Sequence, residues 1–321
     1  MEIISKSYLS TYSINARINL LLSNGKTKNI HISEFKDLCK CVLNKEYKSK
    51  NGANVIDYNV LDEVYINAID INTGQIEKKR ITNWSIHENL KMWDIKKRNR
   101  NSLIPSVGEF KVSEDHSLIV LDMEEETIKR TNIKDVIENQ NKYAFIRSLD
   151  STYRKKEINN VVYLTYIPKS LFKQSKNLVL TNDEKTAIRK NGFTQSRIVI
   201  TDEDIEKIQN ESIRNIVELQ NEQKIQILPC RYFDYNYDPD TTTAYDLTVE
   251  DFQTFSTDDG IFVYDTVALF PLFSKKANDE AREKMNPITS STMWNDPAKS
   301  GKVLYDLKLD ATAIIYTATK R

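Results

Sequence analysis

Side chains suited to proton transfer near neutral pH are scarce in this chain, which has three histidines among 321 residues. One of them, His116, follows Ser113 by three positions in the segment FKVSEDHSLIV. An imidazole with an ordinary pKa near ~6.5 can donate a proton to an amide nitrogen or accept one, and a serine hydroxyl needs such help to act as a nucleophile. This spacing favours chemistry at His116 over a half-buried strand histidine without chemistry, whereas His31 and His87 are expected to be surface or packing residues.

Metal and disulfide chemistry are not expected. The three cysteines, Cys39, Cys41 and Cys230, form an odd and sparse set, which indicates a reducing cytosol rather than a disulfide framework. Cys39 and Cys41 are separated by one residue, which is the wrong spacing for a zinc knuckle. We therefore expect no metal site and no cofactor.

The charge balance and the hydropathy pattern exclude two further classes of protein. Lys plus Arg and Asp plus Glu each number 46, so the basic excess of a nucleic-acid binder is absent and no direct nucleic-acid binding is expected. No stretch reaches the ~18 apolar residues of a membrane span, and the N-terminus lacks a signal-peptide core. We expect a cytoplasmic protein that does not interact with membranes.

The first part of the chain is expected to be β-rich, because polar and apolar residues alternate and β-branched and aromatic residues are common. Residues 18–38 indicate a strand, an Asn-Gly turn, a second strand and a short helix. Residues 45–57 indicate a polar, turn-rich connection. We expect three strands in residues 63–95 and two in residues 107–122.

Helical spacing replaces this pattern near residue 129. Helices are expected in three segments: 132–141, 183–191 and 202–224. Thr201 and Asp202, with Asp204, provide an N-terminal cap for the last of them. Strand character returns at 225–233, 243–249 and 260–270, and a further helix is expected at 274–285.

Two segments carry a resemblance to a known family. Residues 243–265 read TAYDLTVEDFQTFSTDDGIFVYD and are followed by Thr266. They resemble the C-terminal splicing motifs of inteins, which combine Tyr-Asp-Leu-x-Val, an aromatic residue near a polar turn, Gly-Ile-x-Val and a terminal dipeptide before Ser, Thr or Cys. Residues 110–120 resemble the intein motif with a Thr/Ser-x-x-His step between strands. The order and the separation of the two segments also fit.

The intein start is matched further upstream by residues 13–25, SINARINLLLSNG. Ser13 takes the nucleophile position there, and Arg17 replaces the usual Asp. The resemblance implies a mainly β fold, a horseshoe-like Hint domain with an α-containing insert. Its parts are an N-terminal flank at 1–12, the two Hint segments at 13–128 and 230–265, and an insert at 129–229 without a recognisable endonuclease.

The remaining residues, 266–321, resemble a different protein. They begin TVALFPLFSKKANDEAREKM, which is similar to the β′-type catalytic subunit of multisubunit RNA polymerases just after its metal-binding aspartate loop. The loop itself is missing, because residues 261–265 lack the several carboxylates that two Mg²⁺ ions need. An intein inserted directly after that loop explains the absence. Residues 266–321 would then be a short strand-helix host fragment, and no polymerase activity is expected from this chain alone.

The intein resemblance implies a role for each matched residue. Ser13 would attack the preceding peptide bond, with His116 and Ser113 assisting. Thr266 would be the second nucleophile. Asp265 takes the place of the usual Asn and would close through its carboxylate to an anhydride. Asp246, in Tyr-Asp-Leu, would shuttle protons near both junctions.

Two positions depart from the intein pattern. Tyr264 stands where a penultimate His is common, and Gln253 stands where another His is common. Their loss removes acid–base help for cleavage at the C-terminal junction.

We therefore expect single-turnover protein splicing from an RNA polymerase host, in a large virus or phage. The alternative is a degenerate, non-splicing polymerase piece with a structural role. Residues 1–12 do not resemble the expected upstream polymerase sequence, so the upstream fragment is either a separate partner that splices in trans, or replaced, or lost. Other polymerase subunits would be partners after splicing.

Overall fold

The computed structural model describes residues 12–13, 17–48, 53–98, 110–114, 116–149, 164–174 and 178–264, with only the backbone for Tyr12 and Ser13. All of these belong to one compact unit, Tyr8–Thr266. Asp265, Thr266 and the expected helix at 274–285 lie outside the described residues. The described chain is mainly β, as the sequence predicts, with an α-containing segment between two of its strands.

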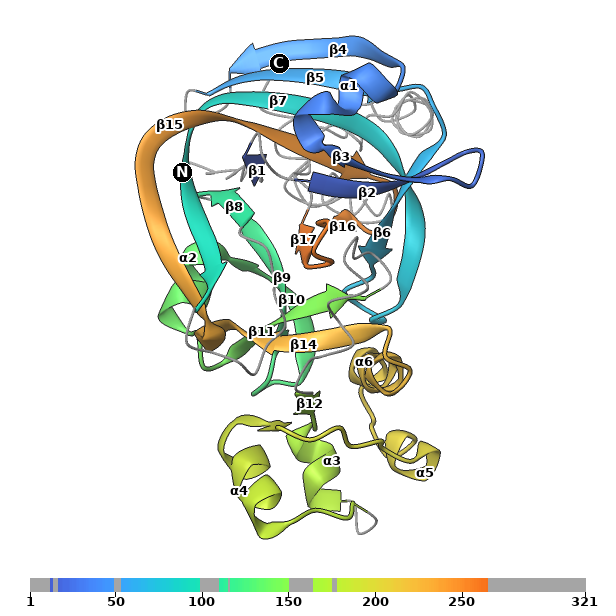
Figure 1. Cartoon of the computed structure of the whole chain (residues 1–321), viewed down its shortest axis with the longest axis vertical. Helices are drawn as coiled ribbons and strands as arrows, with labels where there is room; N and C mark the ends of the chain where they lie inside the picture. The colour runs from blue at the N-terminus through green and yellow to red at the C-terminus, as the bar shows by residue number, and fades with distance from the viewer. Residues whose placement is uncertain are drawn as a thin grey trace, which may run out of the picture. The chain divides into compact units, whose positions relative to one another are not determined.

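Two long antiparallel strands form the frame of the first sheet. They are β7 (Ile76–Lys97) and β15 (Phe233–Val249), and both curve strongly along their length (Figure 1). The sheet has nine strands in the order β15-β1-β8-β7-β6-β2-β3, and β5 joins the hairpin partner β4 to β7. The shorter strands are β1 (Tyr12–Ser13), β2 (Arg17–Leu22), β3 (Thr27–His31), β4 (Cys41–Lys48), β5 (Asn54–Val60), β6 (Val64–Ile69) and β8 (Phe110–Ser113).

A second sheet of six strands contains the C-terminal end of the described chain. Its order is β14-β11-β9-β17-β16, with β10 paired to β9. These strands are β9 (Ser117–Asp122), β10 (Thr127–Asn132), β11 (Tyr143–Ser148), β14 (Ile225–Pro229), β16 (Thr254–Ser256) and β17 (Phe262–Tyr264). Every residue of β9 and of β11 is buried, which makes them central strands with a continuous apolar character.

The helices are short. They are α1 (Phe35–Leu38), α2 (Ile133–Glu138), α3 (Lys169–Gln174), α4 (Asn182–Asn191), α5 (Asp202–Ile205) and α6 (Glu211–Asn221). Helices α3 to α6 lie between β11 and β14, together with the two-stranded sheet of β12 (Thr165–Tyr166) and β13 (Phe193–Thr194). Thr181 caps α4 through a capping box, and Thr201 caps α5 as expected.

Three expectations about elements are wrong. Residues 45–57 were expected to form a connection, but they belong to a hairpin. Its strands β4 and β5 lie on either side of the undescribed residues 49–52. The two strands expected after Gly74 are one continuous strand, β7, which passes through Asn89 at φ 61°. The helix expected at 202–224 is divided into α5 and α6, because Asn210 begins a new cap with its side chain accepting from the backbone of Ser212.

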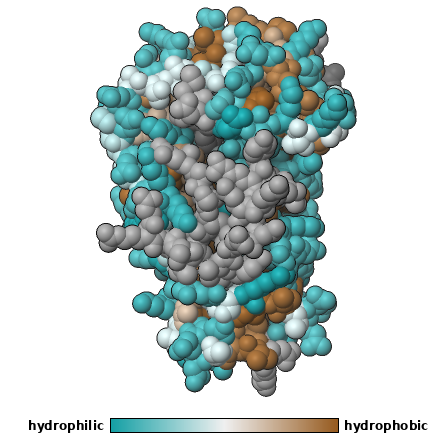
Figure 2. Space-filling view, viewed as in Figure 1, coloured by the Kyte–Doolittle hydropathy of each residue, from teal (hydrophilic) through white to brown (hydrophobic). Residues whose placement is uncertain are grey.

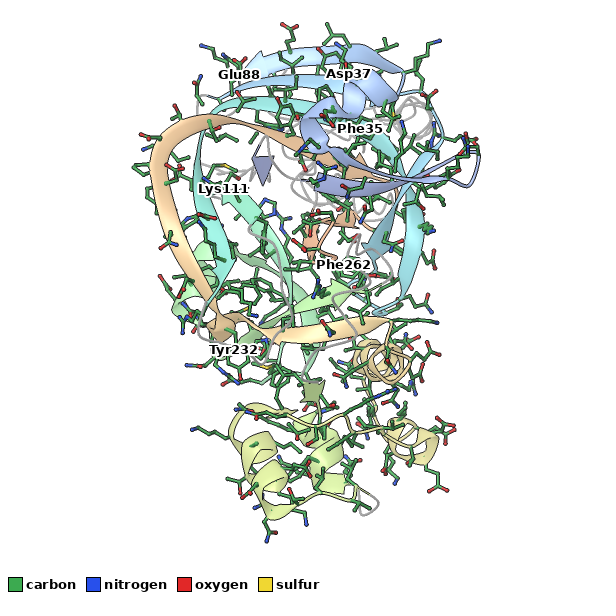
Figure 3. All side chains as sticks on the ribbon, viewed as in Figure 1. Phe35, Asp37, Glu88, Lys111, Tyr232 and Phe262 are labelled. Carbon is green, nitrogen blue, oxygen red and sulfur yellow. The ribbon has the colours of Figure 1, made fainter. Side chains whose placement is uncertain are left out.

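The apolar core lies between the two sheets. It includes Trp84 and Leu247 of the first sheet and Val120 and Phe145 of the second. Phe262 is fully buried and lies within the curve of β7 and β15 in Figure 3. The surface in Figure 2 is mainly hydrophilic, with hydrophobic side chains in separate places. Among the described residues no helix is long and apolar enough to cross a membrane.

Candidate functional site

The sheet register brings Ser13 to two of the other predicted site residues. In β1, Ser13 lies opposite Ala244 and Tyr12 lies opposite Tyr245. On its other side, Tyr12 lies opposite Val112 in β8. Paired strands are about 4.8 Å apart. Asp246 and Ser113 therefore lie on the two strands that flank β1, each one residue beyond the partner of Tyr12.

The step from Ser113 to His116 is a tight turn between two strands. The His116 amide donates to the Ser113 carbonyl oxygen at 2.9 Å, and the His116 carbonyl accepts from the Ile133 amide at 2.9 Å. These two bonds fix the backbone on which the imidazole is carried. Ser113 and His116 are both buried, at 2% and 0% exposed.

The environment keeps His116 neutral. Burial lowers the pKa of His116 to about 3, and the positive charge of Arg130 adds to the effect. A neutral imidazole at pH 7 has one nitrogen that donates and one that accepts. At pH 7 it can accept a proton as a weak base but carries no second ring proton to donate, whereas the sequence predicts an ordinary pKa.

The C-terminal strand ends beside this turn. Val263 of β17 lies opposite Leu118 of β9, two residues after His116. Tyr264 is the last described residue, so Asp265 and Thr266 follow directly outside the described part of the chain. Residues 113–118 thus lead from β8, which pairs with Tyr12, into β9. Strand β9 in turn pairs with β17, the strand before the predicted C-terminal junction.

Tyr264 and Gln253 are held together at that end. The Tyr264 hydroxyl donates to Gln253 Oε1 at 2.7 Å. The guanidinium carbon of Arg130 lies 4.0 Å from the centre of the Tyr264 ring, within the range of a cation–π contact. Tyr264 and Gln253, which occupy the two positions where histidine was expected, are therefore hydrogen-bonded to each other. The guanidinium of Arg130 lies over the Tyr264 ring.

Asp246 is buried in the middle of the first sheet. It is 2% exposed, and its Oδ1 accepts from the Leu247 amide at 2.9 Å. Across the strand pair it lies opposite Ser85 of β7. This carboxylate belongs to the row next to that of Ala244 and Ser13.

One residue beside the predicted site was missed from the sequence. Arg130 belongs to β10, and no local motif marks it, because it influences His116 only through the pairing of β10 with β9. His87 was expected to be a surface or packing residue, and its burial beside Ser85, opposite Val55 and Ala244, agrees with packing.

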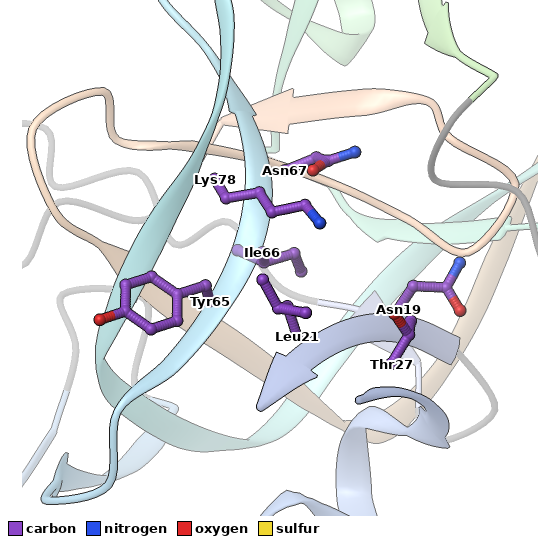
Figure 4. A pocket seen from close by; sticks show the side chains of 7 residues that line it. All are labelled: Asn19, Leu21, Thr27, Tyr65, Ile66, Asn67 and Lys78. Atoms are coloured by element: carbon purple, nitrogen blue, oxygen red, sulfur yellow. The ribbon is translucent and has the colours of Figure 1, made fainter. Parts of the chain in front are cut away.

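Other candidate chemistry is weak in the described part of the chain. No group of three or more His, Cys, Asp or Glu there could hold a metal ion. A small open pocket between β2, β3, β6 and β7 is lined by residues such as Asn19, Tyr65 and Lys78 (Figure 4). None of the predicted site residues lines it, so it gives no support to a ligand at the predicted site.

Comparison with known proteins gave likenesses in structure only. No protein-family model and no curated protein matches the chain. An intein from a hyperthermophile has a TM-score of 0.43 at 9% identity, with 80% of this chain and 99% of that one covered. The transcription factor IIB mini-intein designated Mvu has a TM-score of 0.41 at 13% identity, with 80% and 99% covered.

A DnaB intein from Synechocystis has a TM-score of 0.35 at 13% identity, with 80% of this chain and 99% of that one covered. TM-scores below 0.5 at such low identities do not define a shared fold. The residues of this chain and their strand register are therefore the basis for assigning its function.

Proposed function

We propose that this chain is a self-processing protein-splicing domain of the Hint type, interrupting a host protein whose downstream part begins at Thr266. The observation that carries the proposal is the path of residues 113–118. It joins β8, which pairs with Tyr12, to β9, which pairs with Val263. Splicing requires two distant peptide bonds within reach of one set of groups, and this connection supports such an arrangement.

The first step is an acyl shift at Ser13. The Ser13 hydroxyl oxygen bonds to the carbonyl carbon of Tyr12, the C–N bond breaks, and the hydroxyl proton ends on the released amino group. We assign the proton transfer to His116, which is buried and is held by the turn that begins at Ser113. The product is an ester, and no metal or nucleotide takes part.

The later steps use the C-terminal junction. The Thr266 hydroxyl attacks the ester carbonyl and releases Ser13. The Asp265 carboxylate then closes on its own backbone carbonyl, forming a cyclic anhydride and breaking the bond to Thr266, whose amine takes up a proton. An oxygen-to-nitrogen shift gives a normal peptide bond between residues 12 and 266. Asp246, buried in β15, the strand that pairs with β1, is the proposed proton shuttle.

The host is proposed from the sequence alone. The likeness of residues 266–321 to the β′-type polymerase subunit favours an RNA polymerase host, with polymerase subunits as partners after splicing. The site of action would be the cytoplasm of the host cell.

A non-splicing remnant is the second candidate, and one observation favours it. Tyr264 and Gln253 occupy the positions where histidines are expected, and they bond to each other. Neither titrates near neutral pH as a histidine does. A chain with this pair would protonate the leaving amine of Thr266 slowly.

Incubation of the purified full chain between pH 5 and 8, followed by mass spectrometry, separates the two candidates. Splicing gives the excised segment 13–265 and a product joining 1–12 to 266–321. A remnant gives only the unchanged mass. Ser13→Ala is the matched control, because it removes the first nucleophile and should abolish the joined product.

A further inference from the structure

The side chain of Arg130 lies against the residue that precedes Asp265. Its guanidinium carbon is 4.0 Å from the centre of the Tyr264 ring, well inside the ~6 Å range of a cation–π contact. Arg130 is exposed, whereas Tyr264 is 9% exposed. An exposed arginine gives up rotamer freedom to take one position, so the attraction of the ring offsets that loss.

The two residues belong to strands on opposite sides of β9. Leu118 of β9 lies opposite Thr131 of β10 and also opposite Val263 of β17 (Figure 1). Arg130 and Tyr264 are each one position away from this row, so their side chains leave the sheet on the face opposite to it. Two strand spacings, about 10 Å, separate the backbones of β10 and β17. Arg130 therefore links β10 to β17 across β9.

The backbone of β17 is held by few pairs. It has three residues, and among the described residues it pairs with β9 only where Val263 lies opposite Leu118. On its other side it forms a hairpin with β16, in which Tyr264 lies opposite Thr254. Side-chain contacts of Tyr264 add to these pairs. The hydroxyl end of its ring is held by Gln253, and the face of the ring is held by the guanidinium.

The same cation acts on the histidine of the site. Burial lowers the pKa of His116 to about 3, and the charge of Arg130 is the second cause. A cation changes the pKa of an imidazole in this way only when it is close. Arg130 therefore lies near both His116 and Tyr264, which belong to different parts of the second sheet and its entry turn.

The chemistry of a guanidinium limits what Arg130 can do. Its pKa is above ~12, so it keeps its charge and does not transfer a proton near neutral pH. A histidine at position 264 would instead lose its charge above pH ~6.5. Arg130 cannot replace a general acid at this junction. It supplies a contact that has the same strength across the neutral pH range, and that contact fixes the position of the ring.

We propose that Arg130 is a positioning residue for cleavage after Asp265, which holds the Tyr264 ring so that the main chain entering Asp265 keeps one orientation. The inference rests on the proposed function. Closure of the Asp265 carboxylate on its own backbone carbonyl requires that carbonyl to be oriented for attack. A freely moving strand end would reach this orientation more rarely. Arg130 neither gains nor loses a proton in the step.

Substitutions at both ends of the contact test this role on the full chain. Arg130→Met keeps a long side chain without charge, and Arg130→Lys keeps a cation. Tyr264→Phe keeps the ring, and Tyr264→Leu removes it. Lys36→Met is the matched control, because Lys36 Nζ lies 4.1 Å from the centre of the Tyr58 ring in the first sheet. Mass spectrometry follows release of the fragment beginning at Thr266, and urea unfolding reports global stability.

We expect Arg130→Met to slow release about three- to ten-fold, in line with the strength of cation–π contacts. Arg130→Lys should recover part of that loss. The Met substitution should also slow release in the Tyr264→Phe background but not in Tyr264→Leu, because the latter has no ring to hold. Lys36→Met should release the fragment at the wild-type rate, and the urea midpoint of Arg130→Met should match that of wild type.

Three results would overturn the role of Arg130 alone. They are a wild-type release rate in Arg130→Met, equal slowing by this substitution in the Tyr264→Phe and Tyr264→Leu backgrounds, and slowing that is matched by a lower urea midpoint. The second result would show that the effect does not pass through the ring, and the third would assign Arg130 to general stability. If wild type releases no fragment, both this inference and the proposed C-terminal step are wrong.

Discussion

At the scale of single residues, the site combines predicted groups with groups that no motif reveals. The Ser113-x-x-His116 step was predicted, and the structure makes it a buried turn between β8 and β9. The influence of Arg130 on His116 could not be predicted, because a cation on a paired strand leaves no sequence spacing to recognise. The local motif therefore marks His116 as a candidate, whereas burial and then the nearby Arg130 lower its pKa.

Cleavage at the C-terminal junction depends on the residue at position 265. Asp265→Asn should accelerate release of the fragment beginning at Thr266, because an amide nitrogen closes the ring more readily than a carboxylate oxygen. Asp265→Ala should abolish it. Wild-type release should be slow and should increase as the pH falls towards the carboxyl range, about 4 to 6. Product masses followed over days provide the measurement, and wild-type rates in the Ala variant would contradict the assigned chemistry.

Acid should destabilise the fold through its two buried histidines. Burial lowers the pKa of His87 and of His116 to about 3, whereas an unfolded histidine titrates near ~6.5. The unfolded state therefore binds more protons below pH ~6.5, and stability falls as the pH falls from there towards the folded pKa. Each histidine contributes a slope of up to about 1.4 kcal/mol per pH unit.

Urea unfolding at a series of pH values between 7.5 and 4.5 tests this slope. His87→Gln and His116→Gln should each make the dependence of stability on pH shallower. His31→Gln is the control, because His31 lies on β3 beside Arg17 and is not fully buried. An unchanged slope in both buried-site variants would show that these histidines titrate alike in the folded and unfolded states.

At the scale of elements, the sequence predicts types better than boundaries. The alternation of residues 107–122 gave β8 and β9, and the helical spacing of 183–191 gave α4. The sequence predicts three strands in residues 63–95, yet β7 continues through Asn89 because β15 pairs with it on both sides of that position. Pairing partners distant in sequence, such as Ser13 and Ala244, leave no local signal and decide where the site lies.

The loop before β17 is fixed by a close backbone approach. Gly260 has φ +84°, and its amide is bonded in the turn at Thr257 while its carbonyl accepts from the Ser148 amide at 2.8 Å. A Cβ at position 260 would lie 2.0 Å from the Ser148 carbonyl oxygen. Gly260→Ala should therefore displace the strand that leads to the C-terminal junction and lower stability by about 3–4 kcal/mol.

Gly25 provides the matched control for this substitution. It has φ +75°, but a Cβ there would meet nothing within 4 Å. Gly25→Ala should cost only the backbone strain, about 1–2 kcal/mol. Urea unfolding of the two variants and of wild type gives the comparison. Equal losses in both would mean that the approach of Gly260 to Ser148 does not determine the position of β17.

At the scale of the whole molecule, the two ends of the described chain belong to different sheets. Each end pairs with a strand next to the turn from Ser113 to His116. The first sheet takes up β1 between β15 and β8, and the second takes up β17 beside β9. The predicted mainly β class with helices in the middle agrees with this arrangement. Within the range expected to be an insert, strands β11 and β14 and most of β10 belong to the second sheet.

The most direct test of the account is to sequence the new junction. The full chain is incubated near neutral pH, digested, and analysed by tandem mass spectrometry for a peptide in which Tyr12 is joined to Thr266. The account predicts this peptide in wild type, its absence in Ser13→Ala, and the excised segment 13–265 in equal amount. A folded wild-type chain that keeps its full mass, or a joined peptide that persists in Ser13→Ala, would contradict protein splicing through Ser13.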